Sequence, residues 1–97
     1  MDENVVRERA QAHGDAVVAG DLRRAGGDLT KEAAAQAPAV MAKLPRPLRS
    51  ARVEAVTAAG DDFVARTSYE GDDAATTVDS RWAERDGKVS IVELSLP

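Results

Sequence analysis

The sequence contains no cysteine, a single histidine and only one residue each of Phe, Tyr and Trp. The absence of cysteine excludes disulfides, thiolate nucleophiles and cysteine-ligated zinc, and nothing points to an oxidising compartment. Because large rings are scarce, the core must be built mainly from Val, Leu, Ile and Ala. Basic residues are outnumbered by acidic ones, 13 against 17, and form no unbroken cluster. This pattern argues against a surface that binds nucleic acid through its phosphates.

Long apolar runs are also missing. No window of the chain approaches the length of a membrane span, and the charged start MDENVVRERA lacks the apolar core of a signal peptide. We therefore expect a cytoplasmic protein that does not associate with membranes. With 97 residues, the chain has room for one domain, residues 1–97. A core of this size gives modest stability, so pairing with a second copy would help to bury surface.

The N-terminal half has helical periodicity. A first helix is expected from Asp2 to Ala19, where apolar residues recur at the spacing of one buried face that includes His13 and Val17. Gly14 weakens this helix slightly. The only histidine is therefore expected on the side that faces the core.

Two more helices should follow. Asp21 can cap a short helix over residues 22–25, and Thr30 can cap a third that runs to about Lys43. Pro38 lies in the middle of the third helix, so we expect a kink there or two short helices that meet at residues 36–38. The proline-rich segment 44–48 should be an extended connector.

From residue 53 onward the period changes to two, which indicates strands. Val53, Ala55 and Thr57 should share one face of a first strand, and Phe63 and Tyr69 one face of a second.

The third and fourth runs should close the sheet. Residues 76–84 place Trp82 on one face, with Asp79 and Arg81 on the other. Asp86-Gly87 is a strong hairpin signal. In the last strand, 88–96, we expect Val92, Leu94 and Leu96 on one face and Val89 with Ile91 on the other. The sequence thus predicts an α+β fold in which N-terminal helices pack on a curved antiparallel sheet.

Two motifs accompany this order of elements: AGDL at residues 19–22 and W-x-x-R-D-G-K-V-x-x-V at residues 82–92. With them, the whole chain resembles the nuclear transport factor 2-like superfamily, and its SnoaL-like bacterial branch in particular. The resemblance implies a cystatin-like cone, in which helices pack into the concave face of the sheet and often leave a pocket, while the outer face commonly forms a homodimer. This superfamily includes isomerases, dehydratases, hydrolases and nonenzymatic domains, so the fold does not decide the function. The chain is short for an enzymatic member, which argues against a large cavity.

His13 is the first candidate site residue. It could act as a general base if the cone stays open above it, or it could be a core or interface histidine bonded to a backbone carbonyl. As a metal ligand it is weaker, because there is no second histidine and no carboxylate four residues further on the same face. We therefore expect neither a metal nor another cofactor.

Asp79 is the second candidate, because a carboxylate in mid-strand is uncommon unless it is paired or exposed. If its face is concave, Asp79 and His13 could form an acid–base pair. If that face is convex, Asp79 and Arg81 belong to a cross-strand charge ladder or a dimer contact.

The aromatic residues Phe63, Tyr69 and Trp82 could line a pocket wall together with His13 and Val17, or they could fill the core. The favoured hypothesis is a domain that binds a small apolar molecule or a protein partner, with a homodimer formed through the sheet. The alternative is a small isomerase, dehydratase or hydrolase in which His13 is the general base and Tyr69 or Asp79 its partner. In a third hypothesis the pocket is filled and only the dimer surface acts.

Overall fold

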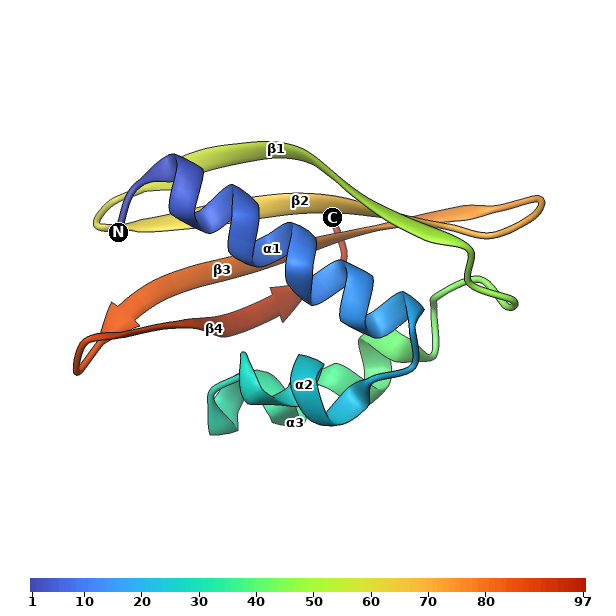
Figure 1. Ribbon diagram of the computed structural model, residues 1–97, viewed down its shortest axis with the longest axis horizontal. Coiled ribbons are helices and arrows are strands. Elements are labelled where there is room, and N and C mark those ends of the chain that lie inside the picture. The colour runs from blue at the N-terminus through green and yellow to red at the C-terminus, as the bar shows by residue number, and fades with distance from the viewer.

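The computed structural model describes all residues, 1–97. Three helices precede a four-stranded antiparallel sheet whose strands lie in chain order, β1-β2-β3-β4 (Figure 1). The elements are α1 (Glu3–Val18), α2 (Leu22–Gly27), α3 (Lys31–Met41), β1 (Ser50–Ala59), β2 (Asp62–Glu70), β3 (Ala75–Arg85) and β4 (Lys88–Ser95). α1 packs on β1 and β2, and α3 packs on β4. The predicted α+β class, with N-terminal helices on an antiparallel sheet, is confirmed. None of the helices has the length and apolar character that a membrane crossing requires.

Local signals set the ends of α1 as the sequence indicates. The Asp2 carboxylate caps the first turn by accepting a hydrogen bond from the backbone N–H of Val5 at 2.9 Å. At the other end, Gly20 has φ of +76°, and the Asp21 N–H donates to the carbonyl of Ala16 at 2.9 Å. This is a Schellman ending, for which glycine is suited because it adopts a positive φ without strain.

The third helix differs from its prediction. Thr30 caps it as expected, but α3 continues through Pro38 as one helix and ends at Met41. The expectation of two helices is wrong, because proline removes only one helical hydrogen bond, and the Ala-rich turns around it together with packing against β4 hold the remainder.

A bulge in β1 changes the predicted faces. Val53 pairs with Thr67 and Ala55 with Arg66, so Glu54 is the extra residue. As a result Val53 and Val56 both turn toward the helices, where they join the core. The prediction that Val53 and Ala55 share a face is therefore wrong, because alternation is interrupted at the bulge.

A second bulge has the same effect in β4. Trp82 pairs with Ile91 whereas Arg81 pairs with Glu93, so Val92 is the extra residue. Val89 and Ile91 share the buried face as predicted, but Leu94 also lies on that side and packs against the core. Its predicted place on the opposite face is wrong.

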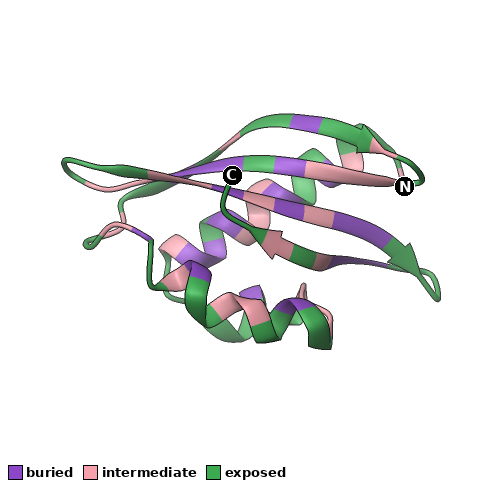
Figure 2. Ribbon diagram, turned by 180° about the vertical axis from the view of Figure 1, so that it is seen from behind, coloured by how far each residue is buried: buried purple, intermediate pink, exposed green.

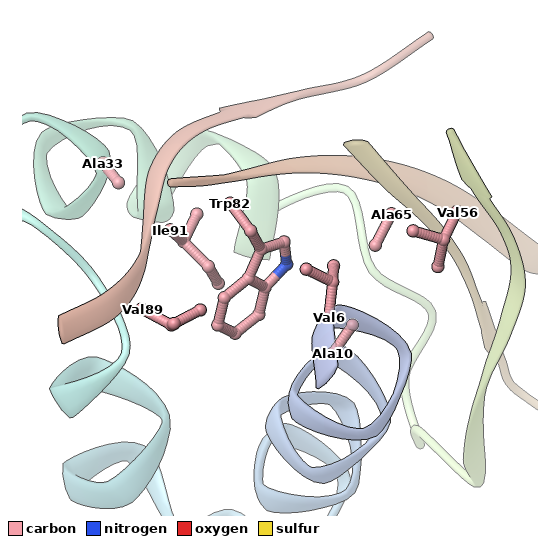
Figure 3. Close-up of a cluster of buried hydrophobic side chains, with 8 residues drawn as sticks. All are labelled: Val6, Ala10, Ala33, Val56, Ala65, Trp82, Val89 and Ile91. Atoms are coloured by element: carbon pink, nitrogen blue, oxygen red, sulfur yellow. The ribbon is translucent and has the colours of Figure 1, made fainter. Parts of the chain in front are cut away.

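The core consists of two clusters on the helix side of the sheet, and buried residues recur along each strand (Figure 2). The first, the Trp82 cluster, contains Val6, Ala10, Ala33, Val56, Ala65, Trp82, Val89 and Ile91 (Figure 3). The second, the Tyr69 cluster, contains Ala16, Val17, Ala25, Val40, Leu44, Ala51, Tyr69 and Val78. Trp82 is fully buried, and its indole N–H donates to the Ser80 hydroxyl at 3.0 Å. That bond satisfies the one polar atom of the ring.

Gly14 determines how closely α1 approaches the sheet. A Cβ at this position would lie 2.8 Å from the Cβ of Ala51 in β1 and 3.7 Å from the hydroxyl oxygen of Tyr69 in β2. The glycine thus lets the helix backbone rest directly on the strands, and it brings the Tyr69 hydroxyl beneath α1.

Candidate functional site

A cavity of about 290 Å³ lies beside the Tyr69 cluster, between the three helices and the sheet. Of its 15 lining residues, 12 are hydrophobic, and α2 and α3 supply most of one wall. His13 and Tyr69 are the only lining residues whose side chains carry a nitrogen or oxygen. An apolar hollow with few polar groups is the usual form of a small-molecule site.

Tyr69 is 5 % exposed, and its hydroxyl has no hydrogen-bond partner in the protein. Burial, helped by the negative charge of Asp15, raises the pKa of Tyr69 to about 12. The hydroxyl therefore remains protonated at neutral pH and is available as a hydrogen-bond donor.

His13 is held by a partner that sequence patterns did not reveal. Its Nδ1 lies 3.0 Å from Oδ2 of Asp28, the residue that follows α2. The imidazole also meets Trp82 edge to face, with ring centroids 6.3 Å apart and planes at 85°. In the tautomer that carries its hydrogen on Nδ1, the ring donates to Asp28 and keeps Nε2 as an acceptor. The sequence expectation of a backbone carbonyl as the partner is thus replaced by a carboxylate.

Both polar groups reach open space. Every fully enclosed side-chain nitrogen or oxygen in the structure has a hydrogen-bond partner. The Tyr69 hydroxyl and His13 Nε2 have none, so neither is enclosed by protein, and both residues line the cavity. Together they offer one donor and one acceptor.

Asp79 lies on the other face of the sheet. Val78, Ser80 and Trp82 face the helices, and Asp79 alternates with them. Its carboxylate receives two hydrogen bonds from Arg66, at 2.9 and 3.0 Å, and these bonds raise the pKa of the guanidinium. The structure therefore does not bring Asp79 and His13 together.

The charge ladder considered for Asp79 is present, but with different pairs. Asp79 pairs with Arg66 across to β2, and Arg81 donates to Asp62 at 2.8 Å. The outer face of the sheet thus carries ion pairs that are satisfied within the chain.

The predicted aromatic wall divides between the two clusters. Phe63, Tyr69 and Trp82 do share the helix side of the sheet. Only Tyr69 lines the cavity, along with His13 and Val17. Trp82 fills the first cluster, and Phe63 packs against that cluster.

Sequence reasoning missed Asp28 and the apolar residues Leu22, Met41 and Leu94 of the cavity wall. No periodicity links position 13 with position 28, because the contact depends on how α2 folds back. The prediction placed Leu94 on the wrong face because simple alternation does not include the bulge in β4. The two helix-capping signals that follow α1, at Asp21 and Thr30, could have indicated that two further helices form this wall.

The described residues contain no group of three or more His, Asp or Glu side chains that could hold a metal ion. Comparison of the chain with protein-family models, with curated proteins and with solved structures found no match.

Proposed function

We propose that the protein binds a small, mainly apolar molecule in the cavity between its helices and its sheet. The observation that carries this proposal is the apolar cavity, whose wall includes the largely buried, protonated Tyr69 with a hydroxyl that is accessible and has no partner in the protein. A ligand oxygen that replaces water at this hydroxyl would accept its hydrogen bond while the rest of the ligand packs on the apolar wall.

The size of the cavity bounds the ligand. An apolar cavity of roughly 150 Å³ is enough for benzene, and this one measures about 290 Å³. The space suits a molecule about twice as large, in keeping with the lower end of the range for ligand pockets.

A cavity-filling substitution tests the proposal. Ala37 on α3 lines the cavity, whereas Ala35 on the same helix is exposed and does not. Titration with the neutral dye N-phenyl-1-naphthylamine should show bright, saturable fluorescence for the wild type and for Ala35→Phe. Ala37→Phe should lose most of it. Equal dye binding by both variants would show that the dye lies elsewhere and would refute the proposal.

The contact between His13 and Asp28 favours a second candidate, an enzyme that moves a proton. A histidine oriented through Nδ1 by a carboxylate presents Nε2 as a general base, and a tyrosine hydroxyl can stabilise negative charge that develops on a carbonyl oxygen. Both groups line this cavity. The corresponding reaction is proton abstraction next to a carbonyl, as isomerases and dehydratases perform it.

Hydrogen–deuterium exchange tests this candidate without knowledge of the substrate. In D₂O, the wild type should speed the loss of the α-hydrogens of 2-decalone, measured by proton NMR, and His13→Gln should not. Exchange at the buffer rate for the wild type would remove the enzyme candidate and leave the binding proposal in place.

Membership of the nuclear transport factor 2-like superfamily and a homodimer through the sheet remain part of the proposal. What supports them is the order of helices and strands and the outer face of the sheet, on which no helix packs (Figure 1). Light scattering after size exclusion should give twice the monomer mass of 10.2 kDa. A monomer at micromolar concentration would contradict the dimer. We also propose that the protein is cytoplasmic.

A further inference from the structure

We infer that the molecule bound in this cavity carries a neutral hydroxyl group, which receives a hydrogen bond from Tyr69 and donates one to His13. This inference rests on the proposed binding function and adds the chemical class of the ligand: an alcohol on a compact hydrocarbon skeleton.

The donor comes from the sheet. The Tyr69 hydroxyl lies beneath α1, where a Cβ at Gly14 would be 3.7 Å from its oxygen. It has no partner in the protein. A protonated phenol in an apolar hollow calls for an acceptor oxygen on the ligand.

The acceptor comes from α1, at the neighbouring position. Nδ1 of His13 lies 3.0 Å from Oδ2 of Asp28, and in the tautomer with its hydrogen on Nδ1 the free Nε2 is an acceptor that reaches open space. An acceptor calls for a donor on the ligand. A hydroxyl is the smallest group that accepts from one partner and donates to another.

Other oxygen groups match this pair less well. A ketone accepts from Tyr69 but leaves His13 Nε2 without a partner. A carboxylate brings a negative charge to a cavity that no Lys or Arg lines, close to Asp28 and Asp15. A buried charge without a counter-charge is strongly disfavoured. The presence of one donor and one acceptor among the lining side chains therefore favours an alcohol.

Four probes with the same ten-carbon skeleton isolate the polar group: trans-2-decalol, trans-2-decalone, trans-decalin and trans-decalin-2-carboxylate. Their dissociation constants are obtained by displacement of N-phenyl-1-naphthylamine from the wild type. We expect the alcohol to bind about tenfold more tightly than the ketone, the size of one hydrogen bond to a buried group. Decalin and the carboxylate should be weaker than the ketone.

Two aromatic substitutions assign the contacts. Tyr69→Phe should weaken the alcohol and the ketone alike, by about tenfold, and leave decalin unchanged. His13→Phe should weaken the alcohol alone and so remove its advantage over the ketone. A thermal melt of each variant checks that it folds. If either variant does not fold, the inference is tested by the wild type alone, through the ratio of the dissociation constants of the alcohol and the ketone.

The possible failures are distinguishable. A ketone, a carboxylate or decalin that binds as tightly as the alcohol overturns the hydroxyl inference but leaves an apolar binding site. The hydroxyl inference is also overturned, and the apolar site retained, if Ala37→Phe abolishes dye binding but the alcohol does not displace the dye from the wild type. Absence of saturable dye binding to the wild type overturns both the inference and the proposed function.

Discussion

Gln11 and Gln36 close opposite edges of the same sheet with their side-chain amides. On the β1 edge, Gln11 Nε2 donates to the carbonyl of Ala51 at 2.8 Å, and its Oε1 accepts from the N–H of Val53 at 3.1 Å. On the β4 edge, Gln36 Oε1 accepts from the N–H of Leu94 at 2.7 Å. The helices thus supply the partners that a further strand would otherwise provide, which protects edges that are prone to pair with other chains.

Replacing Gln11 by Ala should lower the free energy of unfolding by about 1–3 kcal/mol, because two part-buried backbone groups lose their partner. Urea denaturation followed by circular dichroism measures this loss. Glu8→Ala, an exposed position nearby on α1, is the matched control and should change little. Equal effects of the two substitutions would show that the amide bridge adds nothing.

Gly14→Ala should destabilise the fold although alanine is the better helix former. The added Cβ would lie 2.8 Å from the Cβ of Ala51, and overpacking of this kind costs about 1–3 kcal/mol. Gly26→Ala, where a Cβ meets nothing within 4 Å, should be neutral or stabilising by up to about 1 kcal/mol. The double variant Gly14→Ala, Ala51→Gly should recover part of the loss. Thermal melts measure the stability of these variants. A Gly14→Ala variant more stable than the wild type would contradict the close approach of α1 to Ala51.

Stability should fall above pH 10. The pKa of Tyr69 is raised from 10 to about 12 in the folded protein, so between these values the unfolded chain has lost a proton that the folded chain retains. Unfolding then becomes easier as pH rises, and the full effect of two pKa units is roughly 2–3 kcal/mol. Urea midpoints between pH 9 and 12 measure it.

Tyr69→Phe is the control for that pH series, because it should show a smaller decline over the same range. At neutral pH this variant should be as stable as the wild type or more so, since the hydroxyl has no partner to lose. A midpoint that falls equally in both proteins would place the titrating group elsewhere.

Asp79→Asn should leave binding in the cavity unchanged, because Asp79 faces away from the helices and pairs with the half-exposed Arg66. Its effect on the urea midpoint should be slight, as expected for an ion pair on the surface. Dye titration and denaturation test both statements. A loss of dye binding would show that a substitution on the outer face of the sheet changes the cavity on the helix side.

The sequence predicted those parts of the fold that depend on neighbouring residues. Asp21 and Thr30 cap their helices at the expected positions, because capping needs only a side-chain oxygen and the next turn. The hairpin at Asp86-Gly87 formed for a similar reason: both residues adopt positive φ.

What the sequence did not reveal depends on contacts between distant segments. The bulges at Glu54 and Val92 change the faces of β1 and β4, and alternation alone does not locate an extra residue. Gly14 looked like a weak point of a helix, whereas it is the point of closest approach to Ala51. Of the residues in the candidate site, His13 and Tyr69 were predicted from the sequence. Asp28 was not, because its contact with His13 depends on the path that α2 takes through the fold.

The division of the core has a consequence for the order in which the structure opens. The Trp82 cluster contains the largest fully buried side chains, Trp82, Ile91 and Val6, whereas the Tyr69 cluster lies beside a cavity whose wall is formed largely by α2 and α3. Segments with fewer buried contacts open at lower free-energy cost than the rest. Amide hydrogens of α2 and α3 should therefore exchange with solvent before those of β2 and β3, and a bound molecule would slow exchange chiefly in those helices. Exchange rates would thus divide the molecule into a slowly opening part around the Trp82 cluster and a faster opening part around the cavity.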